Sequence, residues 1–149
     1  MALSIQLVHL DPHLPLPAYA HEGDAGLDLV AREAAVVTAG GGRVMMPTGV
    51  SIAIPAGHCG LVLPRSGLAL KHGVTVANTP GLIDAAYRGE IKVVLLNTDA
   101  TTDYEVHRGD RIAQLMIQRF DQVAWNVVAE FDESTTNDDR GGGFGHSGR

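Results

Sequence analysis

The stretch GVTVANTPGLIDAAYRGEIKVVLLN, residues 73–97, decides the fold that we expect for this chain. Its two ends, residues 73–77 and 91–97, are rich in the β-branched residues that favour strands. Between them, Pro80, Gly81 and Gly89 are typical turn residues. The stretch therefore predicts a long hairpin.

The connection inside this hairpin is unusually polar for its apolar surroundings. It contains Asn78, Asp84, Tyr87, Arg88 and Glu90. Unpaired backbone groups in a widened hairpin can read the edge of a flat base, and an aromatic ring can support a sugar. A carboxylate such as Asp84 can orient or deprotonate a water. Taken alone, however, Asp84 and Tyr87 are better explained as turn and packing residues.

Outward from the hairpin, the chain reads as a series of short strands. A first strand is predicted at residues 3–10, where apolar and polar residues alternate. Short apolar segments separated by glycine and proline, about 8 to 12 residues apart, are typical of an all-β sandwich or barrel. These segments are residues 26–31, 34–39, 43–49, 50–57 and 59–67.

One short helix interrupts this pattern. Residues 66–73 favour a helix, with Ser66 as a possible cap at its start and Gly73 as a possible end. Pro64, Arg65, Ser66 and Gly67 would place a guanidinium, a hydroxyl and free amides at the start of this helix. Such a group can bind phosphate, and an ordinary helix cap explains it equally well.

Two apolar runs follow the hairpin. Residues 111–120 fit both a helical period and a buried strand, and we predict a strand because the neighbouring segments are strands. Residues 123–131 predict a last strand, with Trp125 in the core or in an interface.

The composition predicts one globular domain. The chain has 149 residues, 45% of them hydrophobic, and a mean hydropathy of +0.07. No apolar run approaches the roughly 18 residues of a membrane helix, and the N-terminal segment does not resemble a signal peptide. We therefore expect a cytoplasmic protein without a membrane partner. Its single cysteine, Cys59, lies in an apolar run and predicts a buried structural thiol.

The charge balance restricts the class of ligand. A net charge of −6 argues against a long nucleic-acid backbone as partner, because such surfaces need clustered lysine and arginine. A small phosphorylated ligand remains possible, and the nine arginines against two lysines would suit it. The sequence contains neither a conventional phosphate loop nor the spacing of a zinc site.

The last eighteen residues, 132–149, are glycine-rich and polar, with Phe144 as the one apolar side chain. Gly143, Gly145 and Gly148 form a literal G-x-G-x-x-G, but no helix can follow it and the chain lacks βαβ alternation, so a Rossmann site is excluded. A tail that carries Arg140 and Phe144 could close over a nucleotide, although a flexible terminus explains its composition as well.

Together, five stretches resemble the ordered motifs of the trimeric dUTPase family. They are DAGLDL at 24–29, PRSGLALKHGV at 64–74, NTPGLIDAAYRGE at 78–90, RGDRIAQL at 108–115 and RGGGFGHSG at 140–148. The resemblance implies a homotrimer of jelly-roll-like β-barrel or sandwich subunits whose active sites are shared between chains. It also implies Mg²⁺-dependent hydrolysis of dUTP to dUMP and pyrophosphate, which limits uracil incorporation into DNA and supplies dUMP for thymidylate synthesis. The β domain would comprise residues 1–131 and a flexible lid residues 132–149.

The resemblance also implies roles for individual residues. Asp84 would activate the attacking water and contact the sugar, while Tyr87 would pack beneath the deoxyribose. Asn78 and the hairpin backbone, with Ile83, would surround uracil. The catalytic set would include Gln114 beside Asp84. The remaining ligands implied are Arg65, Ser66, Gly67 and Gln114 for the phosphates, Asp28 for Mg²⁺ through water, Arg140 for the γ-phosphate, and Phe144 with Gly145 at the base.

Two alternatives and one departure accompany this resemblance. The family tail usually reads R-G-x-G-G-[FY]-G, whereas three glycines separate Arg140 from Phe144 here, so the tail is one residue shorter. A dCTP deaminase, or a bifunctional deaminase and triphosphatase of the same fold, would need a glutamate to move protons at the cytosine ring, and this chain has Asp84 at the catalytic hairpin position. A catalytically silent module that binds nucleotides is the alternative from another class.

Overall fold

The computed structural model describes residues 3–131, which form eleven strands and one short helix. The strands are β1 (Gln6–His9), β2 (Leu27–Val30), β3 (Ala35–Val37), β4 (Arg43–Pro47), β5 (Val50–Ala53), β6 (His58–Leu63), β7 (Val74–Val76), β8 (Gly81–Ile83), β9 (Lys92–Asn97), β10 (Tyr104–Val106) and β11 (Arg111–Arg119). The helix is α1 (Ser66–His72). The predicted all-β class with one short helix is confirmed.

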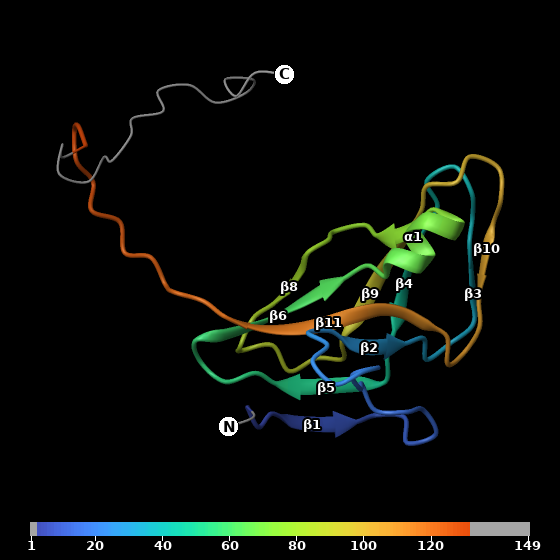
Figure 1. Cartoon of the computed structure of the whole chain (residues 1–149), viewed down its shortest axis with the longest axis horizontal. Coiled ribbons are helices and arrows are strands. Elements are labelled where there is room, and N and C mark those ends of the chain that lie inside the picture. Colours follow the sequence, from blue (N-terminus) through green and yellow to red (C-terminus); the bar gives the residue numbers. More distant parts are fainter. Residues whose placement is uncertain (1–2, 132–149) are drawn as a thin grey trace.

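All strand pairs are antiparallel, and they form four sheets. The largest has the order β2-β11-β6-β8, and the next has the order β4-β9-β7. Two further pairs, β1-β5 and β10-β3, complete the body. Figure 1 shows these sheets gathered around one interior, with β11 running the length of the body and α1 at one end. This is the expected jelly-roll-like sandwich.

The long hairpin predicted from residues 73–97 is present, with an added crossing between sheets. Strands β7 and β9 pair antiparallel, with Val74 opposite Asn97. The connection between them leaves this sheet, because β8 pairs with β6 and places Ile83 opposite Gly60. The residues that follow β8 therefore emerge beside a different sheet from the one in which the hairpin begins and ends.

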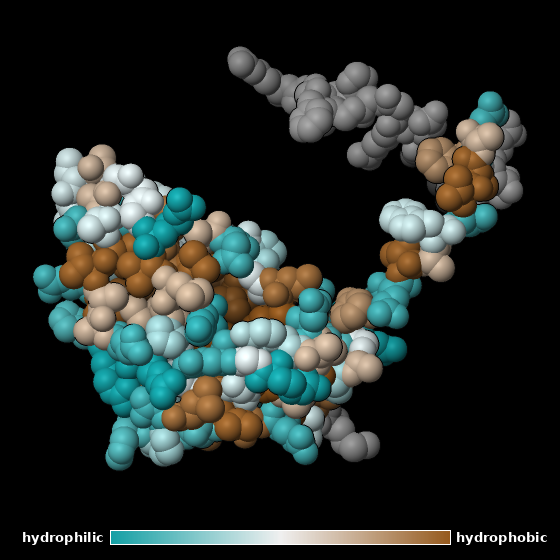
Figure 2. Space-filling model, turned by 180° about the vertical axis from the view of Figure 1, so that it is seen from behind, coloured by the Kyte–Doolittle hydropathy of each residue, from teal (hydrophilic) through white to brown (hydrophobic). Residues whose placement is uncertain are grey.

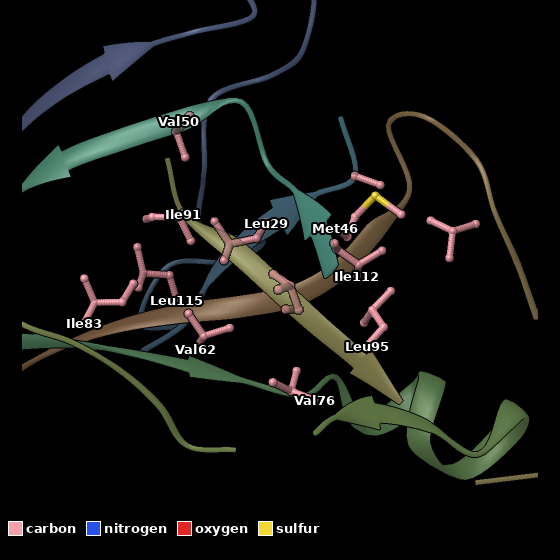
Figure 3. Close-up of a cluster of buried hydrophobic side chains, with 14 of the residues drawn as sticks. Leu29, Met46, Val50, Val62, Val76, Ile83, Ile91, Leu95, Ile112 and Leu115 are labelled. Carbon is pink, nitrogen blue, oxygen red and sulfur yellow. The ribbon is translucent and has the colours of Figure 1, made fainter. Parts of the chain in front are cut away.

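The core collects the inward side chains of every sheet. Along β9, buried and less buried residues alternate, and Val93 and Leu95 are almost fully buried, at 1% and 0% exposure. In Figure 3, β9 crosses the middle of the cluster. Around it lie Ile112 and Leu115 of β11 together with side chains from the other sheets. The alternating burial thus corresponds to one face of β9 turned toward this core, as the pleat of a strand requires.

Asn97 is a fully buried polar residue at the end of β9. Its side-chain amide donates hydrogen bonds to the carbonyl oxygens of Val37 at 3.0 Å and Thr102 at 2.9 Å. Its side-chain oxygen accepts a hydrogen bond of 2.9 Å from the backbone N–H of Asp99. One side chain therefore joins β9 to β3 and closes the loop that leads to β10.

Asn97→Ala is expected to lower the free energy of unfolding by about 2–4 kcal/mol, because it leaves buried backbone groups without partners. The measurement is urea-induced unfolding at one fixed protein concentration. Asn126→Ala, at an exposed position, is the matched control and should change little. A loss below about 0.5 kcal/mol for Asn97→Ala, typical of a neutral surface change, would contradict this account.

Helix α1 begins at Ser66 and ends before Gly73, as predicted, but its N-terminal cap differs from the prediction. Gly73 ends the helix with a left-handed backbone, φ 64°, and its N–H bonds back to the carbonyl of Ala69 at 3.1 Å. The expectation that Ser66 caps the start was wrong: Arg65 occupies the N-cap position, and no side chain caps the helix there. No helix among residues 3–131 is long and apolar enough to span a membrane.

The segment after β11, residues 121–131, departs from prediction. We define it as the arm. The predicted last strand at residues 123–131 is wrong for this chain, since the described residues there form no strand. The arm extends away from the body (Figure 1), and Trp125 is 88% exposed rather than in the core. A strand requires a partner strand, and the described residues of the arm pair with none. Cys59, by contrast, is buried as predicted.

Candidate active site

The polar connection of the hairpin lines a small hollow, which we call the hairpin hollow. Its volume is about 260 Å³. It is lined by Met45, Leu82, Ile83, Asp84, Tyr87, Ile91 and Lys92. Asp84 follows β8 directly and is exposed, so its carboxylate is open to water and to a ligand. The hollow thus combines an apolar wall, an aromatic ring and a free carboxylate.

The loop from Asp84 to Glu90 is held together by its own backbone groups. The N–H of Tyr87 donates to the carbonyl of Asp84 at 3.0 Å, and the Tyr87 hydroxyl donates to the carbonyl of Glu90 at 2.9 Å. The Arg88 guanidinium also donates to the Tyr87 carbonyl at 2.8 Å. Gly89 lies under the Tyr87 ring, where a β-carbon would collide with it. This glycine is therefore required for the observed ring position.

A second hollow, which we call the polar hollow, lies at the start of α1. Its volume is about 440 Å³. It is lined by Ala20, His21, Asp24, Ala25, Gly26, Asp28, Arg65, Ser66, Gly67, Arg111 and Gln114. Five residues predicted separately from the sequence meet here, namely Asp28, Arg65, Ser66, Gly67 and Gln114. The two hollows have no lining residue in common.

Strand register explains why distant motifs meet in the polar hollow. Gln114 of β11 lies opposite Asp28 of β2 and opposite Leu63, the last residue of β6, two residues before Arg65. A register shift between Arg111 and Ala113 interrupts the regular alternation of β11. In a regular strand, residues three positions apart face opposite sides, but after a bulge both Arg111 and Gln114 line the hollow.

Two guanidinium groups flank one carboxylate at the centre of the polar hollow. Asp28 Oδ1 lies 3.5 Å from Arg65 Nε, and Asp28 Oδ2 lies 3.2 Å from Arg111 Nη1. Arg65 also donates to the carbonyl of Arg111 at 2.8 Å. Guanidinium groups bind phosphate oxygens with paired hydrogen bonds. Sequence reasoning missed Arg111, because nothing in its motif reveals the bulge that turns it inward.

Gln114 has a defined orientation. Its amide nitrogen donates to the carbonyl of Pro64 at 2.9 Å. Gly26 provides the space for the amide, since a β-carbon at that position would collide with the Gln114 side-chain oxygen. The hydrogen bond to Pro64 therefore orients the Gln114 amide at the hollow.

The polar hollow suits a metal ion that arrives on a ligand better than a bare one. No group of three or more histidine, cysteine, aspartate and glutamate side chains gathers anywhere in residues 3–131. Asp24 and Asp28 are the two carboxylates in the lining, and the two arginines beside Asp28 would repel a free cation. A cation already chelated by phosphate oxygens is compatible with this donor set, because the phosphates balance the arginines.

Other predicted site residues are not brought into either hollow. Asn78 is exposed and does not line the hairpin hollow, although its amide nitrogen approaches Gly81. Arg140, Phe144 and Gly145 lie outside the described residues.

Comparisons with known proteins point to one family. The family model described as dUTPase matches residues 13–148. The deoxyuridine 5′-triphosphate nucleotidohydrolase of Thermobifida fusca (strain YX) is 54% identical over 144 residues, which cover 97% of this chain and 78% of that protein. The protein of the same name from Mycolicibacterium gilvum (strain PYR-GCK) is 51% identical over 152 residues, covering 99% and 97%.

Solved structures agree with these sequence matches. The dUTPase of Staphylococcus bacteriophage 80alpha with dUPNHPP aligns with a TM-score of 0.88 and 26% identity, covering 99% of this chain and all of that one. A dUTPase from phage phi11 of S. aureus, described with a structural Mg(II) ion, aligns with a TM-score of 0.80 and 25% identity, covering 88% and 100%. The matches extend across the strands that form both hollows.

Proposed function

The chain belongs to the dUTPase family and hydrolyses dUTP to dUMP and pyrophosphate, and we propose that it does so with the residues of its two hollows. The observation that carries the proposal is the polar hollow, where residues from three separate motifs meet around two arginines. A hollow with two guanidinium groups, amides and carboxylates offers donors for phosphate oxygens and an acceptor for a hydrated metal ion, as a triphosphate with its metal requires.

In this proposal the hairpin hollow binds the nucleoside. Asp84 orients and deprotonates the water that attacks the α-phosphorus, which its exposed carboxylate supports. Tyr87 packs beneath the deoxyribose, and Ile83 contributes to the apolar wall. Asn78 and the hairpin backbone pair with the uracil edge. A base with the wrong polar pattern would leave these groups unpaired, and this mismatch provides the selectivity.

The polar hollow binds the triphosphate. Arg65, Ser66, Gly67 and Gln114 hold the phosphate oxygens, and we add Arg111, because it lines the same hollow. The two guanidinium groups now balanced by Asp28 would turn to the phosphates when the substrate arrives. Their positive charge offsets the charge that develops on the phosphate oxygens during attack.

We propose Mg²⁺ as the metal, carried by the triphosphate and contacted by Asp28 through water. The bound ion would neutralise phosphate charge and so favour attack by water. Asp28 would help to position the triphosphate by accepting hydrogen bonds from the water molecules bound to that ion. Without the triphosphate, the same carboxylate remains paired with Arg65 and Arg111.

We propose a homotrimer in which each active site combines groups from different chains. Two observations support this assembly. The hairpin hollow and the polar hollow share no lining residue within one chain, although the reaction needs both. The arm exposes Trp125 at 88%, Val127 at 92% and Phe131 at 84%, and large exposed apolar side chains favour association. Figure 2 shows hydrophobic residues spaced along the arm.

We further propose that residues 1–131 form the β domain and that residues 132–149 close over the bound nucleotide. Arg140 would meet the γ-phosphate, and Phe144 with Gly145 would cover the base. A cytoplasmic location belongs to the same proposal and is supported by the nucleotide substrate.

The test is pyrophosphate release from the purified full chain with Mg²⁺, comparing dUTP, dCTP, dTTP and UTP. Turnover of dUTP alone is the expected result. Ammonia release from dCTP would instead place the chain with the deaminases of this fold. Binding of dUTP without turnover would favour the silent nucleotide-binding module.

Gly26→Ala is expected to lower kcat/KM for dUTP by about tenfold to a hundredfold with little change in melting temperature. The added β-carbon would displace the far end of the Gln114 side chain, which is flexible, rather than the backbone. Gly26 does not have a positive φ, so alanine fits its backbone.

The control for Gly26→Ala is Gln114→Ala, alone and combined with it. The double variant should be no worse than Gln114→Ala, because both changes remove the same amide from the site. If the losses of kcat/KM in the two single variants multiply in the double variant, Gly26 does not act through the Gln114 amide.

A further inference from the structure

The carboxylate of Glu90 is fixed at the end of the loop that carries Asp84 and Tyr87. Its Oε1 atom accepts a hydrogen bond of 2.8 Å from the backbone N–H of Gly49 and lies 3.3 Å from Nη1 of Arg32. The Glu90 side chain is only 16% exposed. A charge so far removed from water needs partners of this kind. The loop end is therefore attached to the turn between β4 and β5.

Arg32, the partner of Glu90, is itself held from two sides. Its Nε atom lies 3.4 Å from Oδ2 of Asp11, and its backbone carbonyl accepts a hydrogen bond of 2.7 Å from Arg108. Arg108 also binds Asp11 through both terminal nitrogens, at 2.6 and 2.9 Å. Its hydrogen bonds hold the pKa of Asp11 well below the usual range, so Asp11 is charged at any pH used for assays.

The backbone next to Glu90 is equally constrained. The N–H of Ile91 donates to the carbonyl of Val50 at 2.8 Å, and the carbonyl of Ile91 accepts a hydrogen bond of 2.7 Å from the buried Thr48 hydroxyl. Glu90 is thus fixed through its side chain and through its neighbour. Its own carbonyl accepts the Tyr87 hydroxyl at 2.9 Å, so the position of this acceptor determines where the Tyr87 ring lies.

We propose that Glu90 is a positioning residue for Tyr87, and that through this contact it controls how well the enzyme distinguishes deoxyribose from ribose. The inference rests on the proposed function, in which the Tyr87 ring lies beneath the sugar. A ring whose hydroxyl is held by a fixed carbonyl keeps its surface in one place against the sugar. When that carbonyl can shift, the ring can withdraw and accommodate a 2′-hydroxyl.

The experiment measures kcat and KM for dUTP and for UTP in Glu90→Ala, Glu90→Gln and Tyr87→Phe. In Glu90→Ala we expect the ratio of kcat/KM for dUTP over UTP to fall by about tenfold, because the substitution removes the side-chain contacts with Gly49 and Arg32 that hold the Glu90 carbonyl in place. Glu90→Gln should recover part of the ratio, because its amide oxygen still accepts from the Gly49 N–H.

A double variant separates positioning from simple stabilisation. If Glu90 acts through the Tyr87 hydroxyl, Glu90→Ala combined with Tyr87→Phe should lower the ratio no further than Tyr87→Phe alone. The matched control is Glu105→Ala, an exposed carboxylate on β10, which should leave the ratio unchanged. Melting temperatures are recorded for every variant.

Each outcome decides the matter. A lower melting temperature for Glu90→Ala with an unchanged ratio would make Glu90 a purely structural residue and overturn the inference. The inference would also be overturned if the losses of this ratio in Glu90→Ala and Tyr87→Phe multiply in the double variant. If Glu90→Ala does not fold, Glu90→Gln and Tyr87→Phe are compared with the wild type instead. A wild-type ratio of kcat/KM for dUTP over UTP in both variants would then overturn the inference. A wild-type chain that does not turn over dUTP would instead contradict the proposed function itself.

Discussion

Asp84→Asn is expected to lower kcat for dUTP by about 10²–10⁴-fold, the usual contribution of a general base. Binding should change little, because a base acts mainly in the transition state. The structure favours a clean result. The backbone carbonyl of Asp84, not its carboxylate, accepts the Tyr87 N–H, so asparagine can replace it without disturbing the loop. The Asp84 carboxylate itself makes no hydrogen bond or ion pair within residues 3–131.

The measurements are single-turnover hydrolysis of dUTP and the affinity for a non-hydrolysable dUTP analogue. Asp121→Asn, a carboxylate exposed at the start of the arm, is the matched control and should retain full activity. Unchanged turnover in Asp84→Asn would remove Asp84 from its proposed role. Equal losses of turnover and affinity would assign it to ground-state binding.

Deletion of residues 140–149 is expected to remove most activity while leaving the fold intact. The buried cluster of the described residues runs from Leu29 to Leu115, so we expect the fold to survive a deletion that begins 25 residues later. The deletion removes Arg140, the proposed partner of the γ-phosphate, and an arginine in such a position contributes on the order of 10³-fold to phosphoryl transfer. Turnover, melting temperature and sedimentation of the truncated chain are the measurements.

Two single substitutions in the same segment refine this result. Arg140→Ala should reproduce much of the loss, whereas Arg149→Ala, the same change at the last residue, should not. A fully active truncation would show that the segment is dispensable and that its shortened glycine run has no consequence. If Arg140→Ala is fully active and the truncated chain is inactive, the activity depends on the glycines or on Phe144 rather than on Arg140.

The fold was predictable where local signals and burial agree. A run rich in β-branched residues identified β9, and Gly73 marked the end of α1, where the backbone is left-handed. The cap at Ser66 was not predictable in the same way, because several polar residues near a helix start compete for that position. The arm reads as a strand because it is an apolar run, but its described residues pair with no strand of the same chain.

The site was predictable as a list of residues and not as an arrangement. Asp28 and Gln114 could be named from their motifs, yet only the register of β2 against β11 places them opposite each other. Arg111 escaped notice because a bulge, which depends on the neighbouring strand, turns it toward the hollow. Glu90 was noted as polar, but its partners Arg32 and Gly49 are distant in sequence, and no local pattern connects them.

The separation of the two hollows has a genetic consequence if the proposed trimer forms. A chain defective at Asp84 still has an intact polar hollow, and a chain defective at Arg65 still has an intact hairpin hollow. When two such alleles are expressed together, mixed trimers form. Some of their sites combine the intact hairpin hollow of one chain with the intact polar hollow of the other. Two inactive gene products would then restore part of the activity between them, which neither could do alone.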